Sequence, residues 1–217
     1  MPNRMRFGST ESISDHQRAL RGQTIEAFLP QRGRVLEVGP GGAKYSRKGC
    51  EVVTVDSLER TEVTARGDVQ ALPFRDDSFD ALIATEVIEH VRYPYKMMRE
   101  MWRVTRPTGR LLLSTPNVAT FTNRVALMFF ALFPDDRTLH EGADVGHLHY
   151  FTRPFFLDAL RSNRFEVLRE WTQLMPITPK RYLYDSVLER TFRNFVKQVI
   201  VECRPRKSEA DVGGAHR

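Results

Sequence analysis

The sequence is poor in cysteine, with only Cys50 and Cys203 among its 217 residues. Two thiols are too few for a disulfide framework or for a cysteine-rich metal centre. They are typical of a protein kept in a reducing compartment, so we expect a cytoplasmic location. The first residues lack the apolar core of a secretory signal, which agrees with that expectation.

Long apolar runs are also missing. The longest covers residues 125–133, far fewer than the roughly 20 residues that span a bilayer. We expect a helix over about 119–132 that is buried against a sheet. Because the run is apolar on every face, contact with an apolar substrate, a second subunit or a membrane surface is the alternative.

Positive charge is unevenly distributed along the chain. The net charge is +6, and residues 153–207 carry 12 Lys and Arg against 6 Asp and Glu. Such an excess attracts anionic partners, but we favour a solvated face followed by a basic tail from Arg204. No arginine-rich stripe with interleaved aromatic residues occurs, so no nucleic-acid partner is expected.

Two short β-runs each end in an acidic residue. The first, residues 34–38, carries Glu37 and leads into a glycine-rich turn at residues 39–42. The second, residues 51–56, ends in Asp56. Glycines after a strand allow positive φ angles and a close approach of the backbone to a ligand. The pattern indicates an α/β sheet that binds an adenosine-containing cofactor.

A dinucleotide is one candidate for that cofactor. Its fingerprint is G-x-G-x-x-G, and Gly39 and Gly41 match the first two glycines, but Lys44 occupies the position of the third. A long side chain there would obstruct the packing of helix on strand. The chain also has no Tyr-x-x-x-Lys pair. An NAD-dependent oxidoreductase is therefore the less favoured alternative.

The same turn resembles motif I of the class I SAM-dependent methyltransferases, E-x-G-x-G-x-G. Glu37, Gly39 and Gly41 match, and Ala43 replaces the last glycine. The resemblance covers about residues 33–172 and implies S-adenosylmethionine as cofactor, with S-adenosylhomocysteine as product. It implies that the turn backs the methionine part, that the acid after the second strand binds the ribose, and that the acid after the third strand accepts from the adenine amino group. The implied cofactor-binding residues are Glu37, Gly39, Pro40, Gly41, Asp56, Ser57, Asp68, Val69, Thr85 and Glu86.

The acceptor side is marked by histidines. His90 lies in a string, residues 86–91, that is locally similar to ubiquinone-pathway O-methyltransferases, and it is our candidate general base. Capping of a helix or fixing of a loop is the alternative role for this side chain. We expect His147, His149 and Tyr150 to line the acceptor pocket or to pack. Two histidines alone are weak evidence for a metal site, so none is expected.

Strands alternate with helices along the chain, which predicts an α/β fold. The resemblance implies a Rossmann-like, seven-stranded, mostly parallel sheet with helices on both faces and the last strand antiparallel. We expect a flexible tail at 1–12, one domain at 13–203 with a variable lid at about 134–153, and a flexible basic tail at 204–217. Asp80, at the start of the fourth strand, is expected to hold the sheet or a neighbouring loop.

The resemblance implies transfer of a methyl group from S-adenosylmethionine to a small-molecule, lipid or glycan acceptor, most readily at oxygen. A SAM-binding partner subunit without catalytic activity is the alternative from another functional class. Peripheral membrane contact through residues 125–133 would fit a lipid acceptor.

Overall fold

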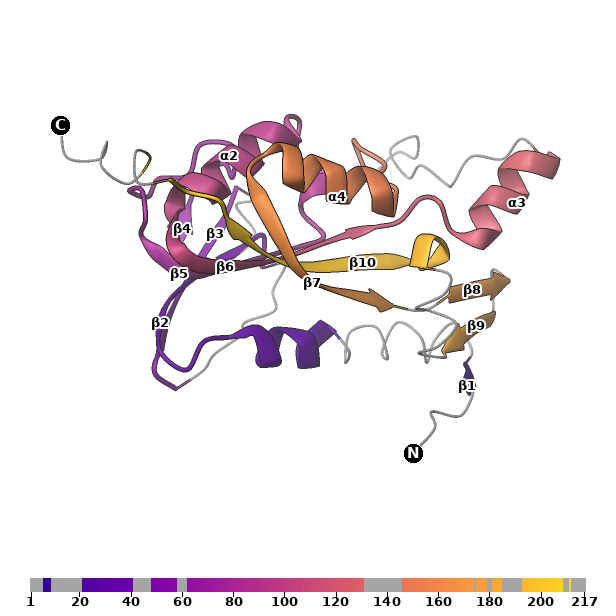
Figure 1. Ribbon diagram of the computed structural model, residues 1–217, viewed down its shortest axis with the longest axis horizontal. Helices are drawn as coiled ribbons and strands as arrows, with labels where there is room; N and C mark the ends of the chain where they lie inside the picture. Colours follow the sequence, from indigo (N-terminus) through magenta and orange to yellow (C-terminus); the bar gives the residue numbers. More distant parts are fainter. Residues whose placement is uncertain are drawn as a thin grey trace.

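The protein is built around a large, mostly parallel β-sheet (Figure 1). The computed structural model describes residues 6–8, 21–40, 48–57, 62–130, 146–173, 175–178, 181–184, 193–208 and 211. In spatial order the seven strands are β4 (Ala65–Arg66), β3 (Cys50–Asp56), β2 (Gly33–Val38), β5 (Phe79–Thr85), β6 (Thr105–Pro116), β10 (Gln198–Pro205) and β7 (Phe165–Gln173).

β10 is the strand that breaks the parallel pattern. β4, β3, β2, β5 and β6 pair in parallel, whereas β10 lies between β6 and β7 and is antiparallel to both. The predicted fold class is therefore confirmed. β10 begins at Gln198, shortly after the 3-10 helix η3 (Arg193–Phe195).

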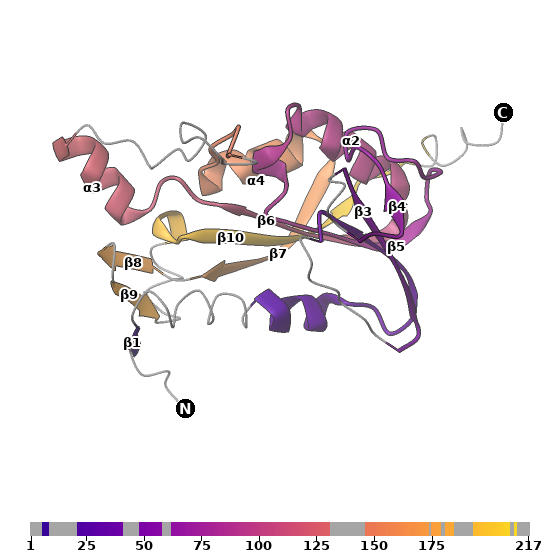
Figure 2. The ribbon, with the colours of Figure 1, turned by 180° about the vertical axis from the view of Figure 1, so that it is seen from behind.

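Helices cover both faces of the sheet, as Figures 1 and 2 show. α2 (Pro94–Val104) and α4 (Arg153–Ser162) lie on one face, and a helix at residues 21–28 lies on the other. Proline can occupy the first turn of a helix without losing a hydrogen bond, and Pro94 begins α2. In α4, the hydroxyl of Thr152 accepts the Phe155 N–H at 3.3 Å and caps the helix.

The two cores follow from the alternation of side chains along a strand. In β5, Leu82 and Ala84 face α2 and α4, while Ala81 and Ile83 face the helix at 21–28. Every one of these strand residues is almost fully buried. The core under α2 and α4 also contains Met97, Met98, Met101, Phe156, Leu157 and Leu160, and the core under the other helix contains Ile25, Phe28 and Leu29.

A small antiparallel sheet was not predicted from the sequence. It consists of β1 (Arg6–Gly8), β9 (Arg181–Tyr184) and β8 (Met175–Thr178), and β9 lies between the other two. β1 belongs to the segment 1–12 that we expected to be a tail. These strands are three or four residues long, too short for a period of two to stand out in the sequence.

The expectation of a buried helix in the apolar run is wrong for its described part. α3 (Phe121–Phe130) is helical as predicted, but Leu127, Met128 and Phe129 are 52%, 70% and 68% exposed. The helix extends beyond the end of the large sheet (Figures 1 and 2), and the described part of the chain leaves these side chains largely uncovered. No helix among the described residues has the length and apolarity needed to cross a membrane.

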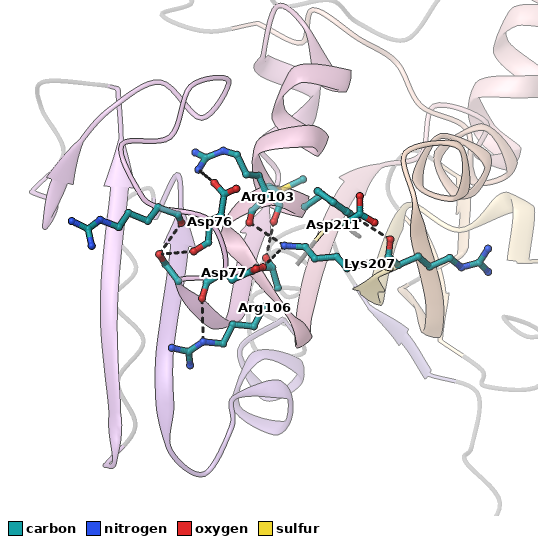
Figure 3. Close-up of polar contacts among 12 residues, drawn as sticks. Asp76, Asp77, Arg103, Arg106, Lys207 and Asp211 are labelled. Carbon is teal, nitrogen blue, oxygen red and sulfur yellow. Dashed lines mark hydrogen bonds and ion pairs between the residues drawn. The ribbon is translucent and has the colours of Figure 1, made fainter. Parts of the chain in front are cut away.

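The predicted basic tail begins later than residue 204. β10 continues to Pro205, and the side chain of Lys207 is only 3% exposed. Its ammonium group forms an ion pair with Asp77 and donates to the carbonyl oxygen of Arg103 at 3.0 Å. Figure 3 shows Lys207 and Arg103 meeting at this point, where the chain after β10 lies against the end of α2.

Asp80 joins the start of β5 to two neighbouring strands, as predicted. It accepts the backbone N–H of Arg34 at 2.8 Å and forms an ion pair with the guanidinium of Arg106. Partial burial acts to raise the pKa of Asp80, but the hydrogen bonds from Arg34 and Arg106 outweigh it and lower the pKa below its usual value. The carboxylate form is therefore the one that stabilises the fold.

We expect Asp80→Asn to lower the free energy of unfolding at pH 7 by about 1–3 kcal/mol, because two charge-assisted hydrogen bonds are weakened. The folded pKa is depressed, so this contribution is present above the ordinary Asp pKa of about 3.9 and is lost as the pH falls through the folded value. Urea unfolding at several pH values should show the difference from wild type shrinking in acid. Asp158→Asn is the matched control, because Asp158 is 73% exposed and its ion pair should contribute little.

Lys207→Met should also destabilise the fold, by about 1–3 kcal/mol, because Asp77 and the Arg103 carbonyl would lose a buried donor. The comparison variant is Arg206→Met, since Arg206 is exposed. Thermal unfolding that shows equal changes for the two variants would contradict a structural role of Lys207.

Candidate cofactor-binding site

A cleft of about 570 Å³ opens at the carboxyl ends of β2, β3 and β5. In α/β sheets this edge is where ligands bind, and the volume is in the range of small-molecule sites. The lining residues are Val38, Gly39, Val55, Asp56, Ser57, Gly67, Asp68, Val69, Gln70, Glu86, Val87, His90, Val91, Arg92 and Leu148.

Gly39 forms the turn that leaves β2. Its φ is +61°, in the left-handed region, and its N–H donates to the carbonyl of Val55 at 2.9 Å. A Cβ at this position would lie 2.7 Å from Cγ2 of Val87, a contact that is too short for two carbon atoms. The turn therefore needs glycine for its backbone angle and for the space that Val87 occupies.

Two acidic residues lie on the neighbouring part of the cleft. Asp56 is the last residue of β3 and is followed by Ser57 in the wall of the cleft. Asp68 accepts the N–H of Gln70 at 2.8 Å and its side-chain amide at 3.0 Å. The first of these bonds is a local turn that a short carboxylate stabilises, so Asp68 both shapes its loop and presents a carboxylate to the cleft.

Glu86 lies at the end of β5 in an unusual backbone conformation, with a φ of +57°. Positive φ in a non-glycine residue is uncommon and occurs at functional sites. The Oε1 atom of Glu86 accepts from the hydroxyl of Ser114 at 2.9 Å and from the side-chain amide of Gln198 at 2.8 Å. Strands β6 and β10 thus fix the carboxylate that lines the cleft.

Glu89 is the buried acid beneath the cleft. It belongs to the 3-10 helix η1 (Ile88–His90) and is 1% exposed. Oε2 accepts from the hydroxyl of Thr115 at 3.2 Å. Burial and, to a smaller extent, the nearby carboxylate of Glu86 together raise the pKa of Glu89 to about 8.

His90 is joined to the loop at residues 146–149. Its Nδ1 lies 3.1 Å from the carbonyl oxygen of Gly146, which can only accept, so Nδ1 carries the hydrogen of this bond. The N–H groups of Leu148 and His149 donate to the carbonyl of Glu89 at 2.8 and 3.1 Å. The loop-fixing role that was the alternative for His90 is thus present in the structure.

Six of the residues named from the sequence for the cofactor lie together in the wall of the cleft: Gly39, Asp56, Ser57, Asp68, Val69 and Glu86. Glu37 and Pro40 are buried beside the turn, and Thr85 ends β5, but none of the three is among the lining residues. Gly41 and residues 134–145 of the expected lid lie outside the described residues.

The acceptor-side residues divide into two groups. His90 lines the cleft, whereas His147, His149 and Tyr150 lie near it without being part of its wall. The rings of His90 and His147 are 4.8 Å apart, and Nε2 of His149 is 3.3 Å from the Arg92 carbonyl.

Sequence reasoning missed several wall residues, namely Val38, Val55, Gly67, Gln70, Val87, Val91, Arg92 and Leu148. Most of them are direct neighbours of residues that were named. Leu148 lies between His147 and His149, so the motif was found and the residue that reaches the cleft was not.

Comparison with known proteins finds a similarity in the segment that forms most of the cleft wall. Residues 36–113 match the family model described as "Methyltransferase domain". A demethylmenaquinone methyltransferase from Renibacterium salmoninarum is 37% identical over 102 residues, which cover 41% of this chain and 43% of that protein. The chain thus matches less than half the length of this curated relative.

Solved structures extend the likeness to most of the chain. A SAM-dependent methyltransferase from Methanosarcina mazei has a TM-score of 0.59 at 16% identity, over 85% of this chain and 98% of that one. The cyclase SpnF has the same TM-score at 14% identity, over 88% and 82%. Identities this low show the fold alone. Residues 36–113 therefore match a methyltransferase domain, and the chain around them has the fold of SAM-dependent methyltransferases.

Proposed function

We propose that the protein transfers a methyl group from S-adenosylmethionine to a small-molecule acceptor. The observation that carries the proposal is the convergence of Gly39, Asp56, Asp68 and Glu86 on one cleft of about 570 Å³. These residues come from four separate segments of the chain. All four lie at the carboxyl ends of parallel strands, which is where α/β sheets bind nucleoside-containing cofactors.

The matching methyltransferase domain implies S-adenosylmethionine as the cofactor, and the residues of the cleft fit it. In the proposal, Asp56 with Ser57 accepts from the ribose hydroxyls, since a carboxylate can accept from both. Asp68 accepts from the adenine amino group and Val69 provides an apolar wall. The tight turn at Gly39 lets the backbone approach the methionine part, which Glu86 borders. When bound, the cofactor supplies an electrophilic methyl group on a sulfonium.

The contribution of the chain to the reaction is alignment. Holding donor and acceptor in line removes most of the entropic barrier to a displacement. If the acceptor is a hydroxyl, it must also lose a proton. We assign that step to His90, which lines the cleft and whose Nδ1–H bond to Gly146 leaves Nε2 as the proton-accepting nitrogen of the neutral ring.

The acceptor is proposed only as a class. One matched relative is a demethylmenaquinone methyltransferase, which favours a small organic acceptor over a macromolecule. We favour oxygen as the atom that is methylated, because a hydroxyl acceptor must lose a proton and His90 can accept it. The neighbouring residues His147, His149 and Tyr150 are proposed to contact the acceptor. A cytoplasmic location stays a prediction from the cysteine content.

Calorimetry with S-adenosylmethionine, S-adenosylhomocysteine and NAD separates the proposed cofactor from its alternative. We expect the first two to bind at one site per chain and NAD to give no heat. Binding of NAD alone would overturn the proposal in favour of an oxidoreductase. Transfer of a labelled methyl group to fractions of cell extract then separates an active enzyme from an inactive SAM-binding subunit.

The ribose assignment has its own test. Asp56→Ala should weaken S-adenosylmethionine binding by about 10- to 100-fold, the loss expected for hydrogen bonds to a charged group, without changing the unfolding midpoint much. Glu51→Ala is the control, because Glu51 lies near the opposite end of the same strand and is exposed. Equal affinities for the two variants would show that Asp56 does not hold the ribose.

A further inference from the structure

A second set of ligating groups lies beside the cofactor cleft. Glu89, His90 and His147 bring one carboxylate oxygen and two ring nitrogens within 4.8 Å of one another. We propose that these three side chains bind a divalent transition-metal ion of the Zn²⁺ type. The sequence led us to expect no metal, because only the two loop histidines, His147 and His149, were considered together. The fold instead pairs His147 with the Glu89–His90 dipeptide of η1.

The spacing of the groups is close to that of a bound ion. Oε1 of Glu89 and Nε2 of His90 are 3.9 Å apart. With bonds of about 2.0–2.1 Å to a tetrahedral Zn²⁺, two ligand atoms lie about 3.4 Å apart. The distances between the ligand atoms, at most 4.8 Å, therefore have to shorten to about 3.4 Å when an ion binds. Rotation of the side chains can provide this change.

Two of the three ligand atoms, Nε2 of His90 and Oε1 of Glu89, offer a lone pair to an ion. The Gly146 carbonyl holds the hydrogen of His90 on Nδ1, so Nε2 of the neutral ring is a lone-pair donor, and it lies 3.9 Å from Oε1 of Glu89. A backbone carbonyl on the second nitrogen is the arrangement typical of metal-binding histidines. In Glu89, Thr115 binds Oε2 at 3.2 Å, while the buried Oε1 has no hydrogen-bond donor among the described residues.

The backbone holds the two parts of the cluster together. The N–H groups of Leu148 and His149 both donate to the carbonyl of Glu89. Together with the His90–Gly146 bond, they fix the loop that carries His147 onto η1. The site is therefore largely formed before an ion arrives, which reduces the entropy lost on binding.

The donor set selects the ion and its role. Two imidazoles and one carboxylate suit Zn²⁺ and its neighbours, whereas Mg²⁺ prefers an all-oxygen shell. Three protein ligands leave one position open, as in catalytic zinc sites. Because His90 also lines the cleft, an acceptor oxygen could bind at that position. The ion would then activate the acceptor in place of His90, whose Nε2 would be occupied.

Titration of the metal-free, full-length protein with Zn²⁺ tests the site without any cofactor. We expect one ion per chain in the wild type, and affinity at least about 10-fold lower in Glu89→Gln and in His147→Ala. His149→Ala is the matched control, since it removes a histidine two positions away that is not in the cluster, and it should bind as the wild type does. Co²⁺ in place of Zn²⁺ should give the visible bands of a four-coordinate ion in the wild type and the control only.

Failure to bind Zn²⁺, or equal binding by all four proteins, would overturn the proposal, and the latter would locate the ion elsewhere on the chain. Mg²⁺ binding that displaces Zn²⁺ would contradict the donor set. Because none of these measurements uses S-adenosylmethionine, their failure would leave the proposed methyl transfer standing, and calorimetry with the cofactor tests that separately.

Discussion

The in-register parallel pairing of β2 with β3 and β5 is the constraint on which the rest of the molecule depends. Val38 is opposite both Val55 and Ala84, so the three strands end at the same level. Gly39, Asp56 and Glu86, which lie at or just after the ends of these strands, therefore meet at one edge of the sheet although they are far apart in the sequence. A slip of one residue would turn each buried side chain to the other face, and would separate these groups as well.

The cleft also depends on the end of the chain. Gln198, the first residue of β10, donates to the carboxylate of Glu86, together with Ser114 of β6. Glu86 has a left-handed backbone conformation that costs about 1–3 kcal/mol. These hydrogen bonds help to hold it there. The last strand of the sheet thus supports a cleft whose wall, apart from Leu148, is formed by residues 38–92.

The central part of this structure was predictable because its residues act locally. Short apolar runs indicated the strands, and the acids that follow the strands indicated Asp56 and Asp68. The hydrogen bonds of Glu86 and the contact between His147 and His90 join residues that are far apart in the chain. No local pattern in the sequence encodes such contacts. The exposed surface of α3 was missed for a related reason, since composition shows that a helix is apolar and not whether another element covers it.

The position of β10 has a consequence for how the protein is made. Of the seven strands of the large sheet, β10 is synthesised last, yet in space it lies between β6 and β7. Until residues 198–205 have left the ribosome, the sheet has two unpaired edges facing an open slot, and each edge can pair with a strand from another chain. The final strand closes the slot through antiparallel bonds on both sides. The sheet is therefore completed only after residue 205 has left the ribosome, and a nascent chain that stalls before residue 198 is the form most exposed to aggregation.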